Sequence, residues 1–434
     1  MFLPLLPIAV TAVSSPPLWL VGPFVLLLLC IAAMPFIHPH WWEKNYPVVA
    51  CGLGGFTVIY YLVGLHHAER VLHTAHEYVS FIALIGSLYI VAGGIHLRVK
   101  GEARPLGNVL FLFLGAVLAN LIGTTGASML LIRPWIRMNK YRITAFHIVF
   151  FIFIVSNAGG CLTPIGDPPL FLGYLKGVPF WWVLEHCWWP WVVMVGGLLA
   201  AFWVLDRRNF RRAPETLRAA ETGNEQWRFD GLVNVLFLLL ILGSVFIKSP
   251  TGLRETVMIL AAFGSWFCTP QRIHEANAFN FHPLLEVGWL FIGIFGTMMP
   301  AFDYLEVHAP VLGIDSAEKF YWLTGGLSGV LDNAPTYLTF LAVAFGNGGL
   351  VLDDPADMQV FLQQHPVELL AISLGAVFFG AFTYIGNGPN FMVKAIAQHA
   401  RVKVPDFFNY LLRYSLPFLL PLLALIALLF VRGE

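Results

Sequence analysis

Two acidic residues, Asp167 and Asp332, lie inside long apolar stretches of the chain. A carboxylate near the centre of a bilayer costs at least about 2.5 kcal/mol, so such a residue is by default a candidate functional group. A desolvated carboxylate can exchange a proton for a metal cation near neutral pH. Both residues are therefore candidate ligands of Na⁺ or H⁺. An alternative for Asp332 is a helix cap that bonds the amides following it, and for Asp167 capping and cation binding could coexist.

Neutral oxygen atoms accompany the two aspartates in the sequence. Hydroxyl and amide side chains supply oxygens that hard cations such as Na⁺ accept, while their O–H and N–H groups could equally hold the carboxylate of a substrate. The candidate residues of this kind are Thr124, Thr125, Ser156, Asn157, Thr163, Asn333, Thr336, Thr383 and Asn387. With the two aspartates they form the predicted ion or substrate site. We expect no cofactor, only transported Na⁺ and H⁺.

These residues occur in a duplicated pattern. Residues 163–169 read T-x-I-G-D-x-P, and residues 383–389 read T-x-I-G-N-x-P. Each copy follows an apolar helix and precedes another. Each also has a second broken segment upstream, at 123–128 in the first half and at 332–336 in the second. The order is therefore a hairpin followed by a broken helix, twice.

The duplication is symmetric in sequence but not in charge. Asp167 corresponds to Asn387, whereas Asp332 corresponds to Gly123. In hydrocarbon, each unpaired backbone amide or carbonyl costs several kcal/mol, so helix breaks persist there only if they line a polar cavity or bind something. Four breaks in duplicated positions, with unequal charge, indicate a site for a cation or a proton.

The composition places these elements in a membrane. Of the 434 residues, 58% are hydrophobic and 12% are charged, whereas charged residues make up about 25% of a soluble globular domain. Apolar runs of about twenty residues, the length that crosses a bilayer, recur from end to end. With 25 Lys+Arg, 25 Asp+Glu and no basic tract, the chain lacks the charge of a nucleic-acid-binding protein.

Four of the apolar spans are unusually long and are interrupted by Gly, Pro, Asn, Asp or Thr. We predict re-entrant hairpins at 109–138 and 317–347 and discontinuous helices at 143–176 and 367–400. The remaining spans are 17–36, 46–65, 78–97, 181–204, 231–248, 252–268, 284–302 and 408–431. If the hairpins dip in and return, ten full crossings remain.

The predicted fold is therefore an all-α polytopic membrane protein with inverted repeats, each holding a re-entrant hairpin and a discontinuous transmembrane helix. The expected segments are N-terminal scaffold helices at 1–76, a first inverted repeat at 77–205, a cytoplasmic linker at 206–230, scaffold helices at 231–283, and a second inverted repeat at 284–434.

Charge placement predicts the orientation. Basic residues flank the first hairpin and occur in two later loops, and the positive-inside rule assigns this side to the cytoplasm. They are Arg98, Lys100, Arg104, Arg133, Arg137, Lys140, Arg142, Arg207, Arg208, Arg211, Arg212, Lys394, Arg401 and Lys403. The second hairpin is flanked mainly by acids, with Lys319 as an exception. The two hairpins are thus expected to enter from opposite faces, with the N-terminus outside.

Other polar residues are weaker candidates. A short stretch with His66, His67, His73, His76, Glu69 and Glu77 could bind a metal, although an interfacial amphipathic segment is the preferred interpretation. His147 is either a proton relay or a buried hydrogen-bonded histidine. Lys394 and Arg133 could pair with a substrate anion or with Asp332, or extend to the interface. Glu77 and Glu286 are expected at the interface rather than buried. The chain has no H-E-x-x-H or G-x-S-x-G motif, and we do not expect an enzyme.

Two motifs resemble those of known transporters. Residues 156–169, S-N-A-G-G-C-L-T-P-I-G-D-P-P, resemble the broken-helix motif of the ion transporter superfamily, and their core is similar to that of the NhaD-type sodium/proton antiporters. Residues 332–335, D-N-A-P, are similar to the second hairpin tip in that group and in arsenite carriers. Citrate and dicarboxylate carriers of the superfamily have Ser-Asn-Thr at their tips, whereas the tips here read Gly-Thr-Thr-Gly and Asp-Asn-Ala-Pro. This difference counts against a carboxylate substrate.

The resemblance implies a homodimer in which the repeats move against a scaffold by an elevator-like motion. It favours a Na⁺/H⁺ antiporter working by alternating access, in which Asp167 and Asp332 bind the cation or proton in turn. The alternative is a sodium- or proton-coupled symporter of citrate or another small anion. The expected partners are the lipid bilayer, a second copy of the chain and a small ion, without nucleic acid. The expected location is a bacterial inner (plasma) membrane.

Overall fold

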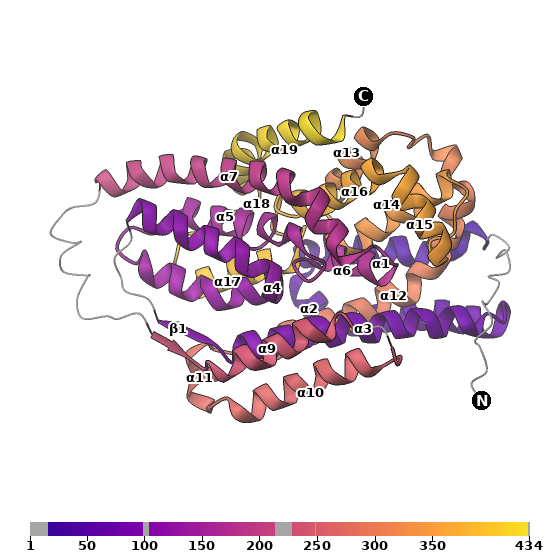
Figure 1. Ribbon diagram of the computed structural model, residues 1–434, viewed down its shortest axis with the longest axis horizontal. Helices are drawn as coiled ribbons and strands as arrows, with labels where there is room; N and C mark the ends of the chain where they lie inside the picture. The colour runs from indigo at the N-terminus through magenta and orange to yellow at the C-terminus, as the bar shows by residue number, and fades with distance from the viewer. Residues whose placement is uncertain (1–15, 99–103, 213–227, 248, 433–434) are drawn as a thin grey trace.

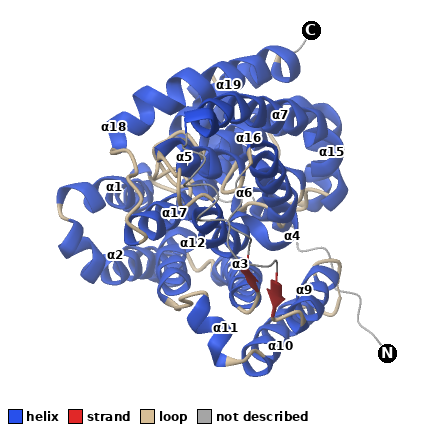
Figure 2. Ribbon diagram, turned by 90° about the vertical axis from the view of Figure 1, so that its left-hand side faces the viewer, coloured by secondary structure: helices blue, strands red, loops and turns tan. Residues whose placement is uncertain are grey.

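The computed structural model describes residues 16–98, 104–212, 228–247 and 249–432, and these residues are almost entirely helical (Figures 1 and 2). Among them, eight helices are long and apolar enough to cross a membrane, or nine if the bent pair α15 and α16 counts as one span. The predicted all-α polytopic membrane fold is confirmed. Residues 213–227 of the predicted linker and Lys100 lie outside the described residues.

The helices follow one another with short connections. In the first half they are α1 (Gly22–Ile37), α2 (Pro39–Ile59), α3 (Ala68–Gly93), α4 (Pro105–Met138), α5 (Ala145–Ile154), α6 (Pro168–Leu175) and α7 (Phe180–Arg212). In the second half they are α9 (Val233–Ser244), α10 (Leu253–Cys268), α11 (Gln271–Ala276), α12 (His282–His308), α13 (Ala317–Ser328), α14 (Asn333–Asn347), α15 (Pro355–Gln364), α16 (Pro366–Phe379), α17 (Gly388–His399), α18 (Phe407–Tyr410) and α19 (Leu420–Ile426).

Shorter elements connect these helices. Segments of 3₁₀-helix occupy Leu18–Val21, Ala158–Leu162 and Ala309–Leu312, and π-helical segments occupy Tyr60–Gly64, Leu411–Leu419 and Ala427–Val431. Two three-residue strands, β1 (His96–Arg98) and β2 (Arg228–Asp230), form an antiparallel ribbon with His96 opposite Asp230. The ribbon joins the two halves of the chain at one end of the bundle (Figure 1).

Helix α4 is a hairpin rather than a straight helix. Asn108 Nδ2 donates to Asn139 Oδ1 at 2.8 Å, and the rings of Phe111 and Trp135 stack at 5.5 Å. In a straight helix these asparagines would be about 46 Å apart at 1.5 Å per residue, so the two arms must run antiparallel. The turn is at Gly123, whose φ of 74° is a conformation that residues with a side chain rarely adopt. The first predicted hairpin is confirmed.

Helices α13 and α14 form the second hairpin. Asn347 Nδ2, at the end of α14, donates to the carbonyl of Ile314, just before α13. With 12 and 15 residues, the arms rise about 18 and 22 Å and cannot cross a hydrocarbon core of about 30 Å. The second predicted hairpin is therefore also confirmed.

The two predicted discontinuous helices are α5 with α6 and α16 with α17. In each break, two glycines bring backbones into contact. A Cβ on Gly166 would lie 2.1 Å from the carbonyl oxygen of Gly160, and one on Gly386 would lie 2.7 Å from that of Gly380. These four glycines occupy corresponding positions of the duplicated motif, so the two breaks share one backbone geometry.

The threonines of the motif extend this correspondence. Thr163 Oγ1 donates to the carbonyl of Asn120, and Thr383 Oγ1 donates to that of Gly329, each at 2.7 Å. Both acceptors lie three residues before the hairpin positions that correspond, Gly123 and Asp332. Each broken helix is thus fixed to the hairpin of its own repeat by the same bond.

The number of long spans differs from the ten predicted crossings. Helices α9 and α10 have only 12 and 16 residues, and α4 is long enough by length although it folds back. Helices α9 and α10 pack against α3 at the lower side of Figure 1. The boundaries of the predicted scaffold and repeat segments remain predictions.

Ion pairs mark two opposite ends of the bundle. At one end Arg142, after α4, pairs with Asp206 on α7. Helix α6 ends at the other, where Lys176 Nζ lies 2.8 Å from Glu77 Oε1 and 2.6 Å from Asp353 Oδ1. We call these the basic end and the acidic end. The basic end gathers residues that the charge analysis assigned to one side, namely Lys140, Arg142, Arg207, Arg401 and Lys403.

The predicted interfacial position of Glu77 is wrong. Glu77 is 4% exposed, because α6 delivers the ammonium of Lys176 against it. A buried carboxylate needs such a partner. The two residues are 99 positions apart in the sequence, so only the fold brings them together.

Candidate functional site

Asp167 lies where all four interrupted elements meet. Its Oδ1 accepts hydrogen bonds from Thr124 Oγ1 at 2.7 Å and from Asn387 Nδ2 at 3.0 Å, and its Oδ2 accepts one from Asn333 Nδ2 at 2.6 Å. The donors come from the first hairpin, the second broken helix and the second hairpin. Asp167 is 1% exposed. The duplicated motifs therefore converge on one buried carboxylate.

The partners of Asp167 are themselves related by the repeat. Thr124 follows Gly123 and Asn333 follows Asp332, so they occupy corresponding hairpin positions, and they bond the two oxygens of the same carboxylate. Asn387 is the counterpart of Asp167. The site thus contains a pair of hairpin donors and an aspartate–asparagine pair, each with one member from each repeat.

Local sequence explains why Asp167 faces the centre. It is the N-cap residue of α6, yet its side chain accepts no capping bond. Pro168 and Pro169 occupy the first two helical positions, and proline has no N–H to donate. The carboxylate is therefore left available to the groups across the site, so capping does not account for Asp167.

Asp332 has a different environment. It caps α14 by accepting a hydrogen bond from the backbone amide of Ala334 at 3.0 Å, as the capping alternative predicted. Its side chain is only partly buried, and it interacts electrostatically with Asp167. Helix N-termini at Thr124, Pro168, Asn333 and Gly388 direct partial positive charge toward this region, which offsets part of the negative charge.

A small cavity lies beside Asp167. Its volume is about 30 Å³, and α3 forms one wall with Leu84, Ile85, Leu88 and Tyr89. The hairpin tip 122–126 and residues 165–168 form the facing wall. Because roughly 10–15 Å³ holds one water molecule, this space suits a single small ion or a water.

One amide oxygen of a residue that bonds Asp167 has no hydrogen-bond donor of its own. Asn333 Oδ1 is buried and has no hydrogen-bond donor among the described residues, although its Nδ2 bonds Asp167. A buried acceptor without a partner costs free energy. An oxygen of this kind next to a carboxylate is a suitable ligand for a cation.

Other predicted residues contact the partners of Asp167 or line the cavity beside it. Asn157 Oδ1 and the carbonyl of Ser156 both accept from Asn387 Nδ2 at 3.2 Å, and Ser156 Oγ lies 2.7 Å from Ser128 Oγ. Thr125 is partly buried and lines the cavity. These residues orient Asn387 or border the space beside Asp167.

Three predicted residues lie outside the centre. Thr163 and Thr383 use their hydroxyls to fix the breaks, as described above. Thr336 Oγ1 donates to the carbonyl of Asp332 at 2.9 Å, within the first turn of α14. A threonine on a helix commonly bonds a carbonyl four residues back, so the hydrogen of this hydroxyl is used within α14, and a role for Thr336 as an ion ligand stays a prediction.

Sequence reasoning missed two buried asparagines. Asn120 accepts from the amide of Leu162 at 2.8 Å and donates to the carbonyl of Gly159 at 2.6 Å. Asn390 accepts from Asn157 Nδ2 at 2.7 Å and donates to the carbonyl of Gly380 at the same distance. Both satisfy backbone groups of the breaks. Their presence in apolar helices was the available signal.

The remaining basic candidates do not contact the aspartates. Lys394 Nζ lies 4.5 Å above the ring of Tyr384. Arg133 has a buried Nη1 with no hydrogen-bond partner among the described residues, and it interacts electrostatically with Tyr89. Among the described residues, no lysine or arginine bonds to Asp167.

The histidine candidates have structural partners. His147 is buried between Asp206, 3.1 Å from its Nε2, and Thr144, 3.0 Å from its Nδ1, which matches the interpretation of a hydrogen-bonded histidine. His73, Glu77 and Asp353 have ligand atoms within 4.8 Å of one another. However, Lys176 Nζ already bonds both carboxylates, and this ammonium supplies the positive charge that a metal would bring.

Comparison with known proteins gives one family. A family model described as "Putative citrate transport" matches residues 13–431, nearly the whole chain. No curated protein matches the chain.

Proposed function

The chain belongs to this citrate-transport family and is a secondary transporter of the membrane, and we propose that it exchanges Na⁺ for H⁺ at the centre formed around Asp167. The family description names citrate, whereas the motifs resemble those of sodium/proton antiporters in the ion transporter superfamily. The chemistry of the centre favours cation exchange.

One observation carries the proposal: a buried carboxylate lies beside a buried amide oxygen that has no donor. Asp167 lines a cavity of about 30 Å³ and supplies negative charge. Asn333, whose Nδ2 bonds Asp167, supplies a neutral oxygen, Oδ1, that has no donor among the described residues. The hydroxyl of Thr124 can rotate so that its lone pair, rather than its hydrogen, faces a cation. Carboxylate, amide and hydroxyl oxygens are the ligands that a hard cation takes.

Exchange follows from competition for one carboxylate. With Na⁺ bound, Asp167 remains charged; with H⁺ bound, it is neutral and bonds its neighbours as an acid. Because the two states cannot coexist, one ion leaves before the other enters. Asp332 adds negative charge near the site while it caps α14. We propose that it raises the affinity for the cation without being the residue that carries the proton.

Alternating access is proposed to use the two hairpins. Thr124 and Asn333 reach Asp167 from opposite sides, so displacing either hairpin would open the centre to one face of the membrane while the other remains closed. We further propose a homodimer in a bacterial inner membrane with the basic end inside and the N-terminus outside.

A symporter of citrate or another small anion is the second candidate, and the family description favours it. The donors around Asp167 and the helix N-termini could hold a carboxylate. A tricarboxylate needs a larger space than the cavity observed and compensating positive charge. Arg133 on α4, whose Nη1 has no hydrogen-bond partner among the described residues, is a candidate for that charge.

Everted membrane vesicles containing the protein and a pH-sensitive dye test the first candidate. After acidification, addition of Na⁺ or Li⁺ should release protons and restore fluorescence, whereas K⁺ should not. Uptake of labelled citrate into proteoliposomes, with and without a sodium gradient, is the parallel assay. Sodium-dependent citrate uptake without cation-driven proton release would replace the first proposal by the second.

A further inference from the structure

A second cavity lies at the basic end, remote from the Asp167 centre. Its volume is about 520 Å³. It lies between residues 136–145, which run from the last turn of α4 to the start of α5, and residues 400–403, which follow α17. The lining residues are Ile136, Lys140, Ile143, Thr144, Ala145, Ala400, Arg401, Val402 and Lys403. Three of the nine are basic and none is acidic. The volume is in the range of small-molecule sites, about 300–1,000 Å³.

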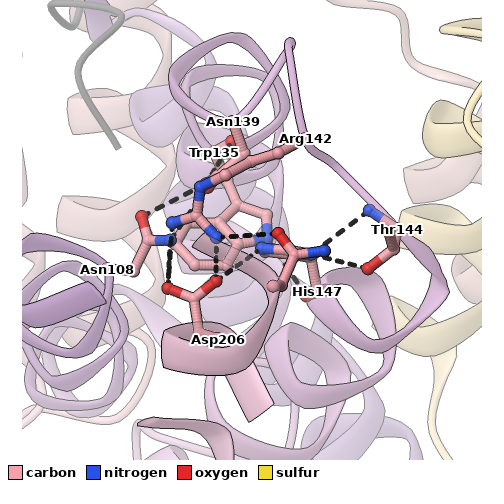
Figure 3. Close-up of polar contacts among 8 residues, drawn as sticks. Asn108, Trp135, Asn139, Arg142, Thr144, His147 and Asp206 are labelled. Atoms are coloured by element: carbon pink, nitrogen blue, oxygen red, sulfur yellow. Dashed lines mark hydrogen bonds and ion pairs between the residues drawn. The ribbon is translucent and has the colours of Figure 1, made fainter. Parts of the chain in front are cut away.

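The wall formed by the first repeat is held in place by a buried polar network (Figure 3). Arg142 pairs with Asp206, and Asn139 accepts from Asn108 at 2.8 Å. Arg142 and Thr144 both extend into this network in Figure 3, Arg142 toward Asp206 and Thr144 toward His147. Because the loop is fixed at both of its ends, the groups it presents to the cavity need no ordering when a ligand binds.

The opposite wall contains an unusual backbone conformation. Arg401 has a φ of 58°, in the left-handed region. It directly follows the last turn of α17, where its amide bonds the carbonyl of Gln398 and the amide of Val402 bonds that of Ala397, each at 2.9 Å. Glycine is the usual residue at such a helix end because it has no Cβ. An arginine here costs conformational energy and adds a basic side chain to the lining of the cavity.

We propose that this cavity is a binding site for a multivalent oxyanion, such as a phosphate group. Arg401 and Lys403 from the second repeat would hold the charge, with Lys140 on the facing wall. The N-terminus of α5 begins at Ala145, in the same wall, and adds partial positive charge. The phosphate could belong to a soluble anion or to the headgroup of an anionic lipid.

An anion bound in this cavity would contact both repeats. The wall at 136–145 leads into α5, which ends before Ser156 and Asn157, and the wall at 400–403 follows α17, which begins after Asn387. A ligand bridging the walls therefore fixes the outer ends of the two half-helices whose inner ends meet near Asp167. This makes the site a means of regulating transport by anion binding, whichever ion is transported.

The test uses the full-length protein in nanodiscs. Pyrophosphate is titrated into protein in phosphatidylcholine nanodiscs by isothermal calorimetry, and lipid binding is measured by native mass spectrometry in phosphatidylcholine nanodiscs with one fifth cardiolipin. We expect saturable binding in at least one arm, and the arm that responds identifies the source of the phosphate. Arg401→Gly combined with Lys403→Gln should weaken that binding by at least about tenfold.

Two controls keep this test decisive. Arg401→Gly removes the left-handed arginine, so the single variant should unfold at the same temperature as the wild type or higher. Arg413→Gln removes an exposed arginine from a neighbouring segment outside the cavity and should bind like the wild type. The proposal is overturned if neither anion binds saturably, or if the double variant binds as tightly as the wild type.

Discussion

Replacing Asp167 with asparagine tests whether the carboxylate itself binds the transported ion. The substitution keeps the shape of the side chain, and Asn387 shows that asparagine fits the equivalent N-cap position of α17. Loss of a charged ligand from a buried site is worth about 3 kcal/mol or more, which corresponds to a factor of over about 100 in affinity. We therefore expect Na⁺-driven proton release to fall to the level of vesicles without the protein.

The same structure predicts a small effect on folding. Three hydrogen bonds reach the carboxylate, and each loses about 1 kcal/mol or slightly more when its acceptor becomes neutral. Removing a charge from membrane depth stabilises the folded protein by about 2.5–3.5 kcal/mol. The two contributions nearly cancel. In addition, Asn333 can turn its unbonded Oδ1 toward the new amide. The variant should therefore unfold within a few degrees of the wild type.

Transport and stability are measured on the same preparation. Dye fluorescence in everted vesicles reports exchange, and thermal unfolding of the purified protein reports folding. Asp315→Asn is the matched control, because this exposed carboxylate at the acidic end bonds only Lys319 among the described residues, and its loss should leave exchange unchanged. If Asp167→Asn exchanges Na⁺ for H⁺ at more than about a third of the wild-type rate, Asp167 is not the ion-carrying group.

Three further outcomes follow from contacts already described. Gly166→Ala would place a Cβ 2.1 Å from a backbone oxygen, so it should abolish exchange and lower the unfolding temperature. Gly196→Ala, whose Cβ would have no neighbour within 4 Å among the described residues apart from the backbone of its own helix, is the control and should change neither property. Asn387→Asp would set two carboxylates at the present 3.0 Å contact and should lower the unfolding temperature. Adding Asp167→Asn should recover most of that loss. If the temperature changes of the two single variants simply add in the double variant, the contact is contradicted. Asp206→Asn removes the carboxylate facing a buried arginine and should cost about 3–5 kcal/mol of stability, read as early thermal unfolding with unchanged ion selectivity.

The fold was largely predictable because membrane proteins follow strict rules. Runs of twenty apolar residues predict spans, and polar interruptions at membrane depth predict breaks. The duplicated T-x-I-G motif then located both breaks. The predicted crossings at α9 and α10 are short helices in the structure, because hydropathy does not show at which residue a helix begins or ends. Whether the scaffold and the repeats move separately remains a prediction.

The candidate site was predicted less completely. Asp167, Thr124, Asn333 and Asn387 meet as the motif suggested, because their positions repeat. The roles of Thr163 and Thr383 were not predictable, since a hydroxyl has the same sequence signal whether it bonds an ion or a carbonyl. Asn120 and Asn390 were missed for the same reason: they serve the backbone of the breaks. The ion pair of Glu77 with Lys176 was not predictable, because it depends on the end of α6 lying against the side of α3.

The pairing of Asp167 with Asn387 also bears on how such a chain could arise. Two identical single repeats, assembled antiparallel from separate polypeptides, would place the same residue on both sides of their twofold axis. Two aspartates would repel each other at the 3.0 Å contact seen here, and two asparagines would provide no charge. Gene fusion removes that constraint by letting one copy keep its acid while the other becomes an amide. The ancestor of this architecture could thus have gained a single central charge only after its halves were joined.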